Sequence, residues 1–159
     1  MNGVGDGKFD PSGATTRGMI VTILYRLEGE PVIRSGMPFS DVKESDWYAK
    51  AISWAESLGI VNGYGDGRFG PNDPITREQL ATILYRYAQH KGEGFKGLWS
   101  FKLDFPDAGT VSGWATEALS WMVMNGVING KDGFLAPGGE ASRAEAATML
   151  MRFCEKIET

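Results

Sequence analysis

One short motif, a threonine or serine followed by arginine, occurs three times and places a cation at the same point of each copy. The arginines are Arg17, Arg77 and Arg143. Each is predicted to lie in the first turn of a helix, where a positive charge opposes the helix dipole and costs a few tenths of a kcal/mol. A bound anion would reverse that cost, because backbone N–H groups at a helix start and a forked guanidinium together form a receptor for a carboxylate. The motif therefore indicates an anion-binding site.

The same arginines could instead serve the fold alone, as partners in structural salt bridges. Asp41 and Asp107 are examples of carboxylates that could take this role. For Arg77 and Arg143 the sequence leaves both roles open. Asp41 and Asp107 then belong either to a ligand groove or to an ion pair with an arginine.

The residues that follow the arginines explain how the helix starts are built and make the three sites unequal. Gln79 and Glu145 complete the capping-box pattern Ser/Thr-x-x-Glu/Gln in the second and third copies. In the first copy Met19 stands at that position. Gly18 also weakens the first helix by about 1 kcal/mol relative to alanine. The site at Arg17 is therefore the least secure, and we expect unequal or partly inactive sites.

Two further kinds of residue are candidates for a binding groove. Trp47 and Trp114 open predicted helices and could either stack on the apolar face of a sugar ring or pack in the core. Trp54 and Trp121 lie seven residues later on the same helical face and are expected in the core. Asp66 lies in a glycine-rich turn, where it either caps the turn through its own side chain or contributes to the groove.

These residues belong to a sequence unit that recurs along the chain. Each copy has a Gly/Asp-rich turn, a short linker and a helix whose apolar residues repeat about every 3.6 positions. The copies cover residues 2–26, 62–86 and 129–152. Helices led by a tryptophan are predicted at about 47–58 and 114–124. Recurrence of one unit predicts a fold built from copies of a single supersecondary element.

The predicted organisation is a partial first unit at 1–30, whole units at 39–90 and 105–159, and an insertion at 91–104. The first unit has a loop and a second helix but no Trp-led helix. Its helix is therefore expected to lack a partner, which leaves an apolar stripe exposed for self-association or covered by another segment. The insertion is expected to be a loop that lays aromatic side chains onto a surface. Its aromatic residues are Phe95, Trp99 and Phe101.

Composition and charge exclude several classes of protein. The chain of 159 residues has a net charge of −4 and no basic run, which argues against nucleic acid as a partner. Cys154 is the only cysteine and His90 the only histidine, so an internal disulfide is excluded and a zinc site or His-based triad is not expected. The loops carry Val4 and Tyr64 where an EF-hand needs an oxygen ligand. No metal, cofactor or catalytic activity is expected, and no apolar run is long enough to span a membrane.

Several motifs combine in each whole unit: a Phe-x-Asp opening, a Trp-led helix, a Gly-Ile/Val-x-Asn-Gly stop, a Gly/Asp loop and a Thr/Ser-Arg helix start. The openings are Phe39-Ser-Asp41 and Phe105-Pro-Asp107, and the stops are Gly59-Ile-Val-Asn-Gly63 and Gly126-Val-Ile-Asn-Gly130. In this combination the units resemble S-layer homology domains. The resemblance implies an all-α fold of tandem helical-hairpin repeats, arranged as a pseudo-threefold body with long Gly/Asp loops.

The resemblance also implies a function at the bacterial cell surface. Such domains bind secondary cell-wall polysaccharide non-covalently, often through a pyruvylated terminal sugar, in grooves between neighbouring units, and thereby hold S-layer proteins or appended enzymes on the wall. The alternative is a protein-interaction or oligomerisation module that keeps the fold and has lost glycan binding. An open groove beside the arginines favours the first function, and arginines tied up in salt bridges favour the second. The candidate ligand-binding residues are Arg17, Asp41, Trp47, Asp66, Arg77, Asp107, Trp114, Arg143 and Glu145.

Overall fold

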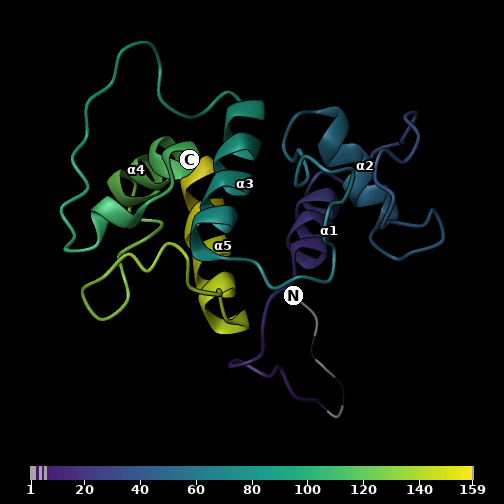
Figure 1. Cartoon of the computed structure of the whole chain (residues 1–159), viewed down its shortest axis with the longest axis horizontal. Helices are drawn as coiled ribbons and strands as arrows, with labels where there is room; N and C mark the ends of the chain where they lie inside the picture. The colour runs from purple at the N-terminus through teal and green to yellow at the C-terminus, as the bar shows by residue number, and fades with distance from the viewer. Residues whose placement is uncertain (1–2, 4, 6, 159) are drawn as a thin grey trace. The chain divides into compact units, whose positions relative to one another are not determined.

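The computed structural model describes residues 3, 5 and 7–158, and its regular structure is helical. Asn2 and Val4 of the first sequence copy lie outside the described residues. The α-helices are α1 (Arg17–Leu27), α2 (Ala49–Ser57), α3 (Arg77–His90), α4 (Thr116–Met124) and α5 (Arg143–Glu158), and the short 3₁₀ turns η1 (Ala108–Thr110) and η2 (Gly113–Ala115) precede α4 (Figure 1). Across the described residues the backbone forms isolated bridges but no strand, which confirms the predicted all-α class. None of these helices combines the length and the apolarity needed to cross a bilayer.

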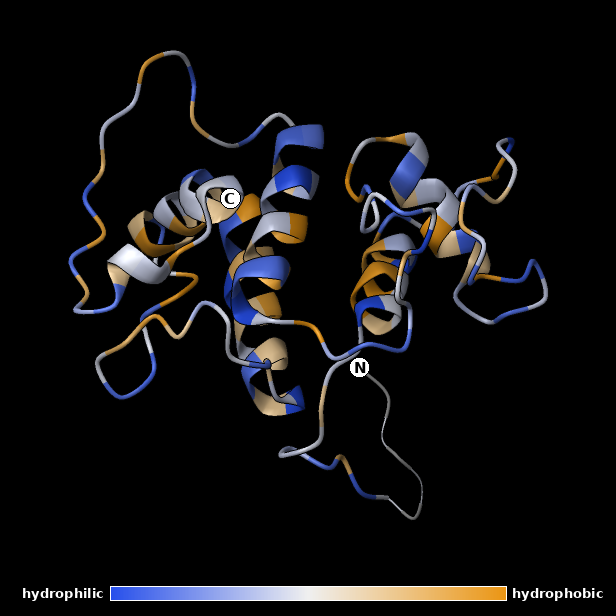
Figure 2. Cartoon of the chain, viewed as in Figure 1, coloured by the Kyte–Doolittle hydropathy of each residue, from blue (hydrophilic) through white to orange (hydrophobic). Residues whose placement is uncertain are grey.

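The helices fall into two compact units. The α1–α2 unit comprises Thr15–Pro74, and the α3–α5 unit comprises Met1–Ala14 together with Ile75–Thr159. Within the first unit α1 packs against α2, and within the second α3 packs against both α4 and α5. The helices carry both hydrophobic and hydrophilic residues (Figure 2), as expected for amphipathic helices that bury one face. Each unit therefore has its own apolar core.

Helix α1 is covered by another segment, which is the second of the two outcomes expected for the helix of the first sequence unit. Ile20, Val21 and Leu24 are fully buried. Tyr25 packs against Trp54 of α2, with ring centroids 5.7 Å apart. The exposed alternative does not occur, because the Trp-led helix of the next sequence unit covers α1. Most of the apolar face of α1 is therefore buried within the fold, while Leu27 at its end remains 51% exposed.

The same pairing recurs between α3 and α4. Tyr85 of α3 packs against Trp121 of α4, again with ring centroids 5.7 Å apart. Trp54 and Trp121 are 6% and 3% exposed, which confirms their predicted place in the core. Both pairs join a helix of one predicted unit to the Trp-led helix of the next. The unit boundaries drawn from the sequence repeats remain a prediction.

Capping boxes form at the starts of α1 and α3. The Thr76 hydroxyl accepts the Gln79 N–H at 3.2 Å, and the Gln79 side-chain oxygen accepts the Thr76 N–H at 2.9 Å. In α1 the Met19 sulfur accepts the Thr16 N–H at 3.3 Å and takes the place of the usual amide or carboxylate. The capping box at the start of α1 therefore forms although Met19 stands where the motif has Glu or Gln.

Gly18 has a packing reason that the motif does not reveal. A Cβ at this position would lie 2.9 Å from the carbonyl oxygen of Pro71 and 3.3 Å from the ring of Tyr48. The ring of Tyr48 thus occupies the space that a side chain at residue 18 would need. Glycine lowers the helix propensity at this position, but it allows Pro71 and Tyr48 to lie close to the start of α1.

Candidate functional site

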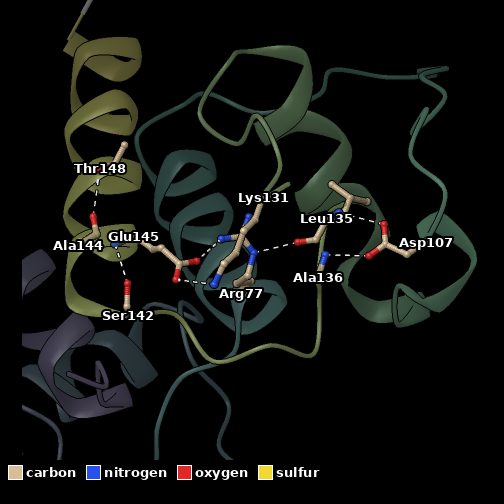
Figure 3. A network of polar contacts seen from close by, with 9 residues as sticks. All are labelled: Arg77, Asp107, Lys131, Leu135, Ala136, Ser142, Ala144, Glu145 and Thr148. Carbon is tan, nitrogen blue, oxygen red and sulfur yellow. Dashed lines mark hydrogen bonds and ion pairs between the residues drawn. The ribbon is translucent and has the colours of Figure 1, made fainter. Parts of the chain in front are cut away.

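Arg77 lies at the centre of a polar network within the α3–α5 unit (Figure 3). Its side chain is 6% exposed. Nε donates to the carbonyl oxygen of Leu135 at 2.8 Å, and Nη1 forms an ion pair with Glu145 at 2.6 Å. The other Glu145 oxygen lies 3.3 Å from the Lys131 ammonium. The arginine at the start of α3 is therefore held by the third Gly/Asp loop and by α5.

Asp107 supports this network through the backbone. Its carboxylate accepts the N–H groups of Leu135 and Ala136 at 2.9 and 2.8 Å, and so orients the peptide whose carbonyl binds Arg77 (Figure 3). Burial raises the pKa of Asp107, but these two hydrogen bonds, a third from its own backbone N–H and the charge of Arg77 together hold the pKa below its ordinary value. Glu145, and not Asp107, is the ion-pair partner of Arg77. The structural salt bridge considered for Arg77 therefore forms, but with Glu145 and not with Asp107, the example considered.

The backbone N–H groups at the start of α3 are also occupied. The Arg77 N–H donates to the Gly139 carbonyl at 2.8 Å, and the Glu78 N–H donates to the Pro137 carbonyl at 2.9 Å. The expectation that free N–H groups help to bind an anion is wrong here, because the third loop supplies acceptors for them. The guanidinium N–H groups of Arg77 that do not contact Leu135 or Glu145 are therefore the donors left for a ligand, and the backbone N–H groups of the helix start are not.

The same contact is built at the starts of α1 and α5. Nε of Arg17 donates to the Phe69 carbonyl at 2.9 Å, and Nε of Arg143 donates to the Phe9 carbonyl at 2.8 Å. The arginines of the first and second copies thus contact the loop of the next copy, and the arginine of the third contacts the loop of the first. The three arginines that share a sequence position also share a structural role.

Asp41 acts in the α1–α2 unit as Asp107 does in the other. Its carboxylate accepts the N–H groups of Phe69 and Gly70 at 2.9 and 2.8 Å. We call Asp41 and Asp107, with these paired hydrogen bonds, the loop clamps. Glycine is required nearby, because a Cβ on Gly63 would lie 2.5 Å from the Phe39 ring. The Phe-x-Asp opening therefore positions the loop that holds the arginine.

The arginine of α1 differs in its charged neighbours. Arg17 is 6% exposed, and its guanidinium lies 4.7 Å from the centroids of both the Tyr64 and the Phe69 rings. Within the described residues it forms no ion pair. Burial lowers the pKa of Arg17, and the nearby Tyr64 and Asp73 oppose that shift. The backbone contacts of this site are intact although its motif is the least regular of the three.

A groove of about 390 Å³ opens beside the start of α5, with Arg77 in its wall. The loop at 127–132 and α5 provide the rest of its lining. The charged residues that line it are Arg77, Lys131, Arg152, Asp132 and Glu145. Three cations and two carboxylates leave one net positive charge, so the groove suits a ligand with one negative charge.

Sequence reasoning missed two of the cations in this groove. Lys131 stands in the third Gly/Asp turn where the second turn has Tyr64, so alignment of the copies could have marked it as a point of difference. Arg152 lies seven residues after Glu145, which is about two helical turns and therefore the same face of α5. Its position within an apolar helix gave no reason to connect it with the motif.

The candidate tryptophans lie outside this groove. Trp47 and Trp114 precede α2 and α4, which begin two residues later than predicted. They are 62% and 57% exposed, and the Trp47 ring meets the Tyr48 ring edge-on at 4.9 Å. Neither side chain belongs to the core, and both are open to a ligand.

Asp66 closes its own turn. Its carboxylate accepts the Arg68 N–H at 3.0 Å and Arg68 Nε–H at 2.9 Å, and both side chains are exposed. The hydrogen bond from the Arg68 side chain lowers the pKa of Asp66. Of the two predicted roles, these contacts match the turn cap.

Acidification is expected to destabilise the α3–α5 unit through Glu145 and Asp107. Burial raises the pKa of Glu145, but Ser142, Lys131 and Arg77 hold it below its ordinary value of 4.5, and the pKa of Asp107 lies below 3.8. A carboxylate with a lowered folded-state pKa stabilises the fold above its unfolded-state pKa, and this contribution is lost as the pH falls through the folded-state value. The free energy of unfolding, measured by urea denaturation, should therefore be level near neutral pH and fall below about pH 4.

The matched control for this prediction is Glu145→Gln, which removes one of the two titrating groups. The variant should lose less stability between neutral pH and about pH 3 than the wild-type chain does. A wild-type free energy of unfolding that stays constant over this range would contradict the assignment.

The charges of the groove favour an anion over a metal ion. Over residues 3, 5 and 7–158, no group of three or more His, Cys, Asp or Glu side chains is placed to hold a metal. The two acidic residues of the groove, Asp132 and Glu145, are outnumbered by its cations. A carboxylate ligand is therefore the chemical class that the groove fits.

Comparison with known proteins identifies the two whole sequence units. The sequence model of the S-layer homology domain matches residues 38–81 and 104–147, together more than half of the chain. The chain is 34% identical to an amylopullulanase of Thermoanaerobacterium thermosulfurigenes, 32% to a surface-layer 125 kDa protein of Lysinibacillus sphaericus and 30% to a cellulosome-anchoring protein of Acetivibrio thermocellus. These matches cover 98%, 99% and 98% of the chain but 8%, 13% and 35% of the relatives. The chain thus corresponds to a minor part of each relative.

Proposed function

The chain belongs to the S-layer homology domain family, and on that premise we propose that it binds an anionic wall polysaccharide beside its helix-start arginines. Domains of this family anchor proteins to the cell wall, so the chain is a cell-wall anchoring module of the cell surface. The proposal adds the ligand and its place. The ligand is a secondary wall polymer that ends in a sugar with one carboxylate, such as a pyruvylated sugar.

The observation that carries the proposal is the buried guanidinium of Arg77 in the wall of an open groove. A guanidinium has five N–H donors. Among the described residues it uses Nε for Leu135 and Nη1 for Glu145. Lys131 and Arg152 line the same groove and give it one excess positive charge. One sugar carboxylate would accept the remaining N–H donors and neutralise that charge, and such charge-assisted contacts are the strong ones.

The name of one relative supports an anchoring role. One is named as an amylopullulanase and another as a cellulosome-anchoring protein. The chain spans 8% of the first and 35% of the second. Because the chain corresponds to the S-layer homology region, we assign to it the attachment of a larger protein and no reaction.

Binding to purified peptidoglycan sacculi tests the proposal. In a sedimentation assay, the affinity of the chain for sacculi that carry their secondary polysaccharide is expected to be at least tenfold higher than for sacculi from which that polymer has been removed. The physical reason is that removal of the polymer takes away the carboxylates that the arginine groove binds. Bovine serum albumin, another acidic protein, serves as the control for sedimentation without specific binding.

Equal binding to both kinds of sacculi would overturn the polysaccharide assignment. Absence of binding to either would favour the alternative, a protein-interaction module on the same scaffold. One support for that alternative, an uncovered helix, is lost because α2 covers α1, whereas the ion pair of Arg77 with Glu145 is a feature that the alternative expects.

A further inference from the structure

The insertion at 91–104 carries an aromatic pair that the anchoring motifs do not explain. Residues 82–103 lie between the two matches to the family, so most of the insertion is outside them. The segment forms a long arch from the end of α3 to the start of α4 (Figure 1). The rings of Phe95 and Trp99 stack within it, with centroids 4.1 Å apart and planes 5° from parallel. We call this pair the aromatic platform.

The platform is fixed to both neighbouring helices. The indole N–H of Trp99 donates to Glu117 of α4 at 3.1 Å, and the Phe95 N–H donates to the hydroxyl of Tyr85 on α3 at 3.1 Å. Tyr85 is itself 3% exposed and packs on Trp121 in the core. A ligand would therefore meet rings that are already ordered, and little conformational entropy would be lost on binding.

The platform has the size and chemistry of a surface for one sugar ring. Both aromatic side chains are partly exposed. A fully exposed aromatic side chain offers about 150–250 Å², whereas a stable protein interface takes about 800 Å² from each partner. The two rings by themselves therefore fall short of the area of a protein interface. The C–H face of a pyranose is flat and apolar, its edge carries hydroxyls, and the carboxylate of Glu117 at the platform edge can accept a hydroxyl hydrogen.

We propose that the outward face of Trp99, whose other face is backed by Phe95, stacks on an uncharged sugar ring of the wall glycan. This contact lies outside the arginine groove and needs no anionic group on the sugar. It would give the anchor a second, weaker hold on the wall, and simultaneous engagement of two sites on one polymer matrix raises the overall affinity without new contacts at either site.

Sacculi stripped of their secondary polysaccharide isolate this second contact, because their glycan strands of N-acetylated hexosamines remain. The wild-type chain is expected to keep weak binding to them, and Trp99→Ala to weaken that binding roughly tenfold. Trp99→Tyr keeps a stacking ring and should retain most of the binding. Leu98→Ala is the matched control, because Leu98 is fully exposed in the same loop. An N-acetylglucosamine hexamer is expected to compete with the sacculi.

The outcomes separate this proposal from the anchoring proposal. Arg77→Met should leave binding to stripped sacculi unchanged, while Trp99→Ala should leave intact sacculi clearly preferred over stripped ones. If Trp99→Ala binds stripped sacculi as wild type does, or if the wild type shows no binding that the hexamer can displace, the platform does not bind sugar. A circular dichroism spectrum equal to that of wild type shows that loss of binding does not come from loss of folding.

Discussion

Replacing Asp107 with alanine is expected to lower the free energy of unfolding by about 3 kcal/mol. The substitution removes the acceptor of the Leu135 and Ala136 N–H groups. Leu135 is 1% exposed, so water has little access to its N–H once the carboxylate is gone. Hydrogen bonds to a charged group contribute about 1.5–3 kcal/mol each, and part of the loss is recovered where Ala136 meets solvent. Urea denaturation at pH 7 measures the change.

Two variants make this measurement specific to the loop clamp. Asp41→Ala removes the equivalent carboxylate of the α1–α2 unit and should destabilise the chain by a similar amount. Asp104→Ala removes an exposed carboxylate three residues before Asp107 and should change the free energy of unfolding by less than about 0.5 kcal/mol. Equal stability of Asp107→Ala and Asp104→Ala would show that the clamp contributes nothing.

Replacing Arg77 with methionine is expected to weaken binding to polysaccharide-bearing sacculi roughly 30-fold. That factor corresponds to the loss of about 2 kcal/mol, which is typical for a charge-assisted hydrogen bond to a carboxylate. Stability should also fall by about 2 kcal/mol, because Glu145 loses the cation that lies 2.6 Å away and keeps only Lys131 at 3.3 Å. Sedimentation with sacculi and urea denaturation measure the two effects on the same sample.

A double variant separates the binding role of Arg77 from its structural role. Arg77→Met with Glu145→Gln removes both members of the ion pair, so no unpaired carboxylate remains and much of the stability should return. Binding should stay weak, because the groove still lacks its guanidinium. Lys102→Ala removes an exposed cation of the same unit and should change neither quantity. Recovery of full binding in the double variant would mean that Arg77 acts only by neutralising Glu145.

The helices and their buried faces were largely predictable because they depend on near neighbours in the chain. The period of the apolar residues and the capping pattern place the starts of α1, α3 and α5 at the Thr/Ser-Arg motif. Trp54 and Trp121 lie in the core as predicted. Periodicity shows that one face of a helix is apolar, but it does not show which segment covers that face. The partner of α1 was therefore missed, although the burial of its face follows from the pattern.

The candidate site was only partly predictable, because its contacts join residues far apart in the chain. A carboxylate that recurs with an arginine suggests an ion pair, and on that ground Asp107 was a reasonable partner for Arg77. The structure uses Asp107 for two backbone N–H groups instead. Ala136, one of the two donors, takes a left-handed conformation with φ 48°, which no propensity of alanine foretells. Glu145 then becomes the free carboxylate that reaches Arg77.

The sequence by itself determined that the chain is an all-α repeat protein, that three arginines occupy equivalent helix starts, and that these motifs are those of S-layer homology domains. The helical class and the helix starts follow from periodicity and capping, which act over a few residues; the repeat follows from recurrence along the chain, and the family from the resemblance of the combined motifs. Only the tertiary structure decided which helix covers which, and which group each arginine and aspartate binds. The Leu135 carbonyl lies 58 residues from Arg77 in the chain, and Glu145 lies 68 residues away. Contacts over such distances depend on the folded path of the loops between them, and a pattern of neighbouring residues does not encode that path in readable form.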